Sequence, residues 1–178
     1  MSSPSPGFEL RHVIATLAYR AEKALRDVPS DFSQFRPSPH SRSALALVAH
    51  LGDLMEWAER MARGEVRWQS IPQTSWTSAT DRFFRGLAAL DQTLTEALPE
   101  GRPHALIFQG PVADALTHVG QLMMMRGMVG APARPESYAR ARIRAGRVGT
   151  DQDAVRAEFD GDASPQSPGR AAEGEGSQ

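Results

Sequence analysis

Two residues in the segment 111–130 have side chains and a spacing that suit metal binding. Asp114 and His118 are four positions apart, so on a helix their Cβ atoms would lie about 5–6 Å apart on one face. His50 lies beside the apolar stripe of another expected helix and would join them if the two helices are neighbours. Two imidazoles and one carboxylate leave coordination positions open for water or substrate. We therefore expect His50, Asp114 and His118 to hold a divalent metal. Zn, Ni, Fe and Mn all suit these ligands.

The segment 111–130 also carries a polar stripe on an otherwise apolar helix. Asp114, Thr117, His118 and Gln121 recur at helical spacing, and no Arg, Lys or Glu joins them before Arg126. Because solvent-facing helix surfaces usually carry long charged side chains, we interpret the stripe as the lining of an internal pocket. The alternative is an ordinary solvent face. We expect Gln121 and Thr117 to orient a ligand rather than to contact metal.

Each of the three candidate ligands also has a purely structural interpretation. Asp114 falls in the first turn of its expected helix, where a carboxylate favours the helix dipole without any metal. His118 could be a core histidine hydrogen-bonded to Gln121 or Thr117, and His50 one that donates to a carbonyl. A spacing of four between an aspartate and a histidine is common by chance. The inward position of His50 is what makes the set specific.

Four segments with apolar residues at helical spacing position these side chains, and no strand-like alternation is present. The segments are 8–28, 39–63, a helix that follows Ser78 and ends near residue 98, and 111–130. This pattern predicts an all-α fold, a four-helix bundle. The connections are about ten to fourteen residues long, which is more than tight hairpins need, so we expect at least one crossover.

Local signals place the ends of these helices. Ser38 is the expected N-cap of the second helix, with proline at its first position, and Gly64 is its expected end. Ser78 to Asp81 fits a capping box for the third helix. Pro111 is expected at the first position of the fourth helix. On the first helix, the expected outer face carries four residues, namely His12, Thr16, Tyr19 and Lys23.

Composition limits the classes of function. A chain of 178 residues with 40% hydrophobic content can bury one core. A net charge of −1 suggests no nucleic-acid partner, and the absence of cysteine excludes disulfides, thiolate metal sites and a cysteine nucleophile. No apolar run is long enough for a membrane span, and no signal peptide is visible, so we expect a cytoplasmic protein.

The chain should form one domain with extensions. We expect disorder in 1–7, the bundle with a C-terminal extension in 8–150, and a flexible acidic and Gly-rich tail in 151–178. The arginines of 134–147 and the acidic residues that follow them are expected to neutralise each other or to be solvated. Four methionines, Met123, Met124, Met125 and Met128, add more apolar surface to the fourth helix than one core can receive, so we expect a homodimer.

Two segments resemble a known family. ALALVAHLGDLMEWA, which contains His50, and VADALTHVGQL, which contains Asp114 and His118, look like the signature helices of the DinB/YfiT-like superfamily of four-helix bundles. In that family a histidine on helix 2 and two positions four apart on helix 4 hold a divalent metal. His50 and His118 match ligand positions. The other helix 4 ligand, usually histidine, falls on Asp114, and the usual ending of the motif matches residues 118–121.

The resemblance implies a class of reaction. Family members of assigned activity are largely metal-dependent thiol transferases that use a small thiol cosubstrate, or related isomerases. Because this chain lacks cysteine, any thiol would have to be a cosubstrate. Metal-assisted hydrolysis is a second enzymatic interpretation. The alternative is a non-enzymatic, metal-stabilised dimeric module for binding or stress response. An open coordination position that faces a cavity would favour an enzyme.

Overall fold

The computed structural model describes residues 6–65, 67–96 and 104–155, and within them the fold is all-α with no strand. The helices are α1 (Pro6–Leu25), α2 (Ala44–Arg63), α3 (Trp76–Thr95), α4 (His104–Ile107) and α5 (Ala113–Met128). The segments 1–5 and 156–178, which hold most of the expected disordered ends, lie outside this description. Pro6 and Gly7 belong to α1, so the helix begins earlier than expected. No described helix has the length and apolar character that crossing a membrane requires.

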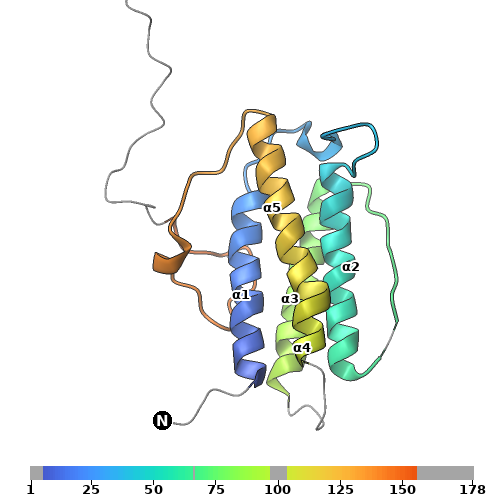
Figure 1. Cartoon of the computed structure of the whole chain (residues 1–178), viewed down its shortest axis with the longest axis vertical. Helices are drawn as coiled ribbons and strands as arrows, with labels where there is room; N and C mark the ends of the chain where they lie inside the picture. Colours follow the sequence, from blue (N-terminus) through green and yellow to red (C-terminus); the bar gives the residue numbers. More distant parts are fainter. Residues whose placement is uncertain (1–5, 66, 97–103, 156–178) are drawn as a thin grey trace, which may run out of the picture.

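The long helices α1, α2, α3 and α5 form the bundle shown in Figure 1. Both α1 and α2 pack against α3 and α5, so α1 lies diagonal to α2. Residues 67–75 run along the outside of α2 and return the chain to the end of the bundle where α2 began (Figure 1). Consequently α2 and α3 run in the same direction, and their connection is a crossover of the kind expected at one or more of the long connections. α2 and α3 also approach closely, since a Cβ added to Gly86 would lie 2.8 Å from the Cβ of Met55.

The caps of α2 and α3 differ from those expected. The N-cap of α2 is Ser43, whose hydroxyl accepts from the amide of Ala46. Ser38 instead forms a turn closed by the amide of Ser41. Ser75, rather than Ser78, caps α3 and accepts from the Ser78 amide. Several Ser residues lie near each start, and local sequence does not decide which of them meets a free amide. Gly64 does end α2, in the left-handed conformation with φ 87°.

Pro111 does not open the fourth helix. It lies inside a π-helical turn, Phe108–Val112, that joins α4 to α5. Proline removes one helical donor, and the wider turn accommodates this loss because the amide of Ala113 bonds to the Phe108 carbonyl five residues earlier. The chain enters this turn from α4, which begins at the partly buried His104.

The segment 129–155 covers one face of α1 (Figure 1). The hydroxyl of Tyr19 donates to the Glu136 carboxylate, and the Lys23 ammonium donates to the Asp153 carbonyl at 2.6 Å. Tyr19 and Lys23 are thus buried, not on an outer face. Asp153, assigned from sequence to a flexible tail, also pairs with Arg147 at 2.5 Å, as expected for that basic run.

Candidate metal centre

Three side chains from two helices converge in the structure. His50 comes from α2, and Asp114 and His118 come from α5. One ligand atom from each lies within 4.8 Å of the other two. Nε2 of His50 is 3.6 Å from Oδ2 of Asp114, and Nε2 of His118 is 3.4 Å from Oδ1 of the same carboxylate. The two imidazole rings lie 5.0 Å apart at 72°.

These separations suit a shared cation. Imidazole nitrogens and carboxylate oxygens bind Zn²⁺ at about 2.0–2.2 Å, so two donors in one tetrahedral shell lie roughly 3.3–3.5 Å apart. The separations of 3.6 and 3.4 Å are close to that spacing. The two distances end on different oxygens of Asp114, and one donor atom from each residue lies within 4.8 Å of the others, so the group could hold a metal ion once the side chains move closer together. Its nitrogen and oxygen donors do not choose between Zn, Ni, Fe and Mn.

Gln121 fixes the orientation of one imidazole. Its Oε1 lies 2.8 Å from Nδ1 of His118. An amide oxygen can only accept, so this contact is a hydrogen bond when Nδ1 carries the proton, and Nε2 is then the nitrogen that can bind a metal. This is the tautomer that a metal at Nε2 requires. Thr117 does not orient a ligand as expected, because its hydroxyl donates to the Ala113 carbonyl one turn earlier on the same helix.

The polar stripe of α5 lies at the surface, so the expected internal pocket is wrong. Thr117 and Gln121 are exposed, and the Asp114 side chain is 47% exposed, whereas those of His50 and His118 are 16% and 12% exposed. The stripe instead borders a surface pocket of about 420 Å³, lined in part by His118 and Gln121. A second pocket, of about 430 Å³, adjoins His50. The carboxylate thus remains accessible between two more buried imidazoles.

The surroundings of His50 favour its neutral form. Burial, followed by the positive charge of Arg42 and the proximity of His118, lowers the pKa of His50, and Asp114 and Asp53 oppose these effects. Trp68 packs edge-on against the His50 ring at 5.7 Å and against Trp57 at 5.5 Å. A neutral imidazole is the form that binds a cation.

Asp114 does not face a free helix end. It lies in the first turn of α5, but α4 and the π-turn precede that turn, and the amide of Ala113 is already bonded to the Phe108 carbonyl. The dipole of an open N-terminus is therefore weaker here than the sequence suggested. Within the described chain, the basic side chains within 4.0 Å of this carboxylate are those of the two histidines.

A buried ionic network, which we did not anticipate, holds the crossover loop beside His50. Arg82 of α3 donates to Asp53 at 2.7 Å and to both oxygens of Glu56 at 2.7 and 2.8 Å. Asp53 in turn accepts from the hydroxyl of Ser70 and the amide of Ile71. Asp53 falls between Leu51 and Leu54 in sequence. A charged residue so close to an apolar stripe was the sequence feature that could have indicated a buried ion pair.

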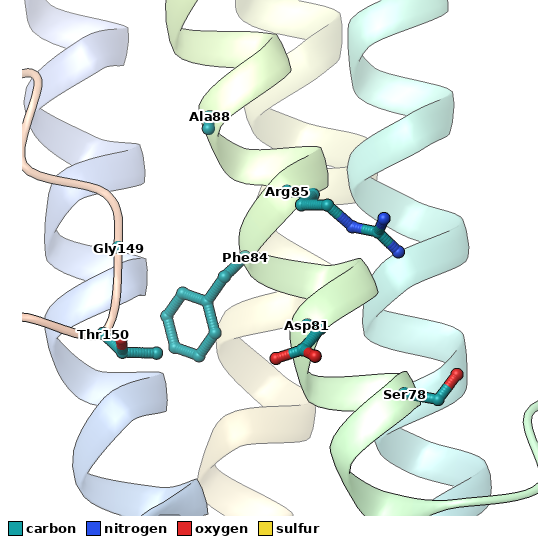
Figure 2. A pocket seen from close by; sticks show the side chains of 7 residues that line it. All are labelled: Ser78, Asp81, Phe84, Arg85, Ala88, Gly149 and Thr150. Atoms are coloured by element: carbon teal, nitrogen blue, oxygen red, sulfur yellow. The ribbon is translucent and has the colours of Figure 1, made fainter.

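A larger pocket, of about 580 Å³, is lined by residues of α3 and by Gly149 and Thr150 (Figure 2). In it Phe84 of α3 points toward Gly149 and Thr150, whereas Arg85 turns toward α2. None of the expected site residues lines this pocket. Comparison of the chain with protein-family models, curated proteins and solved structures finds no match.

Proposed function

We propose that the chain is a metal-dependent enzyme that acts on a small molecule, and that it is a thiol transferase of the DinB-like kind. The observation that supports this most directly is the convergence of His50, Asp114 and His118 at separations suited to one cation. Three protein ligands leave coordination positions vacant, which is typical of catalytic rather than structural metal sites. Together with the two adjoining pockets, this favours an enzyme over a closed, purely structural metal site.

The protein groups would have distinct tasks. His50 ties the ion to α2, while His118, oriented by Gln121, ties it to α5. Asp114 contributes the negative charge and is the most accessible of the three. A bound divalent ion would lower the pKa of a thiol cosubstrate, so that the thiolate is available at neutral pH. The thiol proton would pass to solvent, and the thiolate would form a carbon–sulfur bond to an electrophile in a neighbouring pocket as the bond from that carbon to its leaving group, such as a halide, breaks and the leaving group departs as an anion.

Metal content is the first test. The chain should be purified without a nickel column, incubated with Zn²⁺ or Mn²⁺, desalted and measured by elemental analysis. We expect about one ion per chain, and none for His118→Ala. His12→Ala is the matched control, since His12 is an exposed histidine on α1 away from the group. If the parent and His118→Ala retain equal amounts of every metal offered, the site and the enzyme proposal are both refuted.

Activity is the second test. Metal-loaded protein should be assayed with glutathione, bacillithiol or mycothiol and an aryl halide as electrophile, with consumption of free thiol as the readout. We expect consumption with one of these thiols that stops on chelation and is absent in His118→Ala. If metal binds tightly but no thiol is consumed, the transferase assignment is wrong. The non-enzymatic module would then be favoured.

A further inference from the structure

Arg42 lies between the two pockets that adjoin the donor group, meaning His50, Asp114 and His118. It is the one residue that lines both the pocket at His118 and the pocket at His50. Its position follows from the fold, because it directly precedes Ser43, the N-cap of α2. A small molecule bound in either pocket would therefore lie beside both Arg42 and one of the candidate histidine ligands.

No described residue neutralises Arg42. Its guanidinium forms no hydrogen bond or ion pair within the residues that the structure describes. The carboxylate that lines the His50 pocket is that of Asp53, and it already accepts hydrogen bonds from Arg82, Ser70 and Ile71. Arg36, also in this pocket, donates to the Ser41 carbonyl. With a divalent ion on the donor group, the whole region would carry a net positive charge.

The pocket at His118 combines this free cation with apolar walls. Leu47 and Met125 are buried residues of its lining, Met124 is an exposed one, and Pro37 completes the apolar part. Arg42 and Ser41 supply polar groups from the segment before α2, and His118 and Gln121 supply them from α5. A volume of about 420 Å³ lies within the range of small-molecule sites.

We propose that Arg42 is the anion-binding residue of this site, and that its ligand is a small carboxylate with an apolar body. The carboxylate pairs with the guanidinium, and the apolar body lies along Leu47 and Met125 toward His118. Arginine suits a planar carboxylate because its donors match both oxygens. The inference rests on the proposed function in that it names the class of substrate for the same site. The anion site itself can be tested separately from the metal.

The test uses hexanoate and its neutral analogue hexanamide as probes of the full-length, Zn²⁺-treated protein. The protein carries ¹³C-labelled methionine methyl groups, and NMR titration follows Met124 and Met125. We expect hexanoate to shift both resonances and to bind more tightly than hexanamide. Arg42→Gln should weaken hexanoate about five-fold, as for a partly exposed ion pair, and leave hexanamide unchanged. Arg85→Gln is the matched control, because Arg85 is an exposed arginine in the distant pocket.

The outcomes separate the two proposals. If hexanoate binds no better than hexanamide, or equally well to Arg42→Gln, the role of Arg42 is refuted. The same holds if chelation abolishes hexanoate binding while Arg42→Gln does not, since the carboxylate would then bind the metal directly. If the protein retains no metal but hexanoate binding still depends on Arg42, the metal-dependent function fails and the anion site stands.

Discussion

Replacing Arg126 by methionine should loosen the attachment of α5 to the end of α1. Arg126 is buried, and its Nη1 donates to the carbonyls of Lys23, Ala24 and Arg26 at 2.9, 3.4 and 2.8 Å. Its Nε donates to the Ala131 carbonyl at 2.9 Å. One side chain thus satisfies carbonyls at the C-terminal end of α1, which have no intrahelical partner. Methionine preserves most of the volume but none of these bonds.

The expected loss in the free energy of unfolding depends on how many of these carbonyls water cannot reach once the guanidinium is removed. Arg26 is exposed, so water can replace the guanidinium there, whereas Lys23 and Ala24 are buried. Two buried carbonyls without partners cost about 1–3 kcal/mol each. Burial lowers the pKa of Arg126, so removing the charge recovers some desolvation energy. We therefore expect the free energy of unfolding to fall by about 2–3 kcal/mol.

Urea denaturation of Arg126→Met and Arg85→Met provides the measurement. Arg85 is exposed, and no described residue bonds to its guanidinium, so its replacement should change the free energy of unfolding by less than about 0.5 kcal/mol. If Arg126→Met is within that same margin of Arg85→Met, then Arg126 does not satisfy the end of α1 and the reasoning is refuted.

Three further predictions concern the site, the C-terminal segment and assembly. His50→Ala should lose tight metal binding, as His118→Ala does. Asp114→Asn should bind metal more weakly and keep its fold, and Gln121→Ala should retain metal with reduced affinity. Metal titration measures the affinity, and thermal shift measures the stability of the fold. A parent-like Asp114→Asn beside a metal-free Gln121→Ala would contradict this assignment. Burial and the bond to Glu136 raise the pKa of Tyr19 above its usual 10.0, so its stabilising effect is complete below pH 10.0 and declines above it. Tyr19→Phe should unfold more readily than the parent at pH 8, and the difference should shrink as the pH rises above 10, as followed by urea denaturation. Finally, Met124 and Met128 are 60% and 54% exposed, so light scattering at micromolar concentration should give a dimer mass. A monomer mass would contradict it.

The sequence was sufficient to predict the helical class and the convergence of the candidate ligands. Apolar spacing identifies α1, α2 and α3 and the greater part of α5, and the inward position of His50 holds because Leu47, Leu51 and Leu54 fix the rotation of α2. Once α2 and α5 are neighbours, His50 must meet the residues of α5 that face it. The length of the connections also predicted at least one crossover, and the connection between α2 and α3 is one.

Features that depend on distant parts of the chain could not be predicted. Tyr19 and Lys23 lie on the polar side of α1, and only the docking of 136–153 buries them. The prediction of an internal pocket was wrong because the lack of long charged side chains on α5 does not by itself indicate that its polar residues are buried. The choice of Ser43 and Ser75 as caps depends on where the preceding loops bring the chain, which local propensity does not record.

The π-turn before α5 has a consequence for tolerance to insertions and deletions. A π-turn holds one more residue than the α-helical turn it replaces, so it resembles a one-residue insertion absorbed within a helix. Deleting one residue from Phe108–Val112 would restore a regular helix but rotate α4 by about 100° relative to α5. Buried Ile107 would then turn away from the core while α5 kept its ligands facing α2. Changes of length in this part of the chain should therefore be tolerated by the candidate site and limited by the packing of α4.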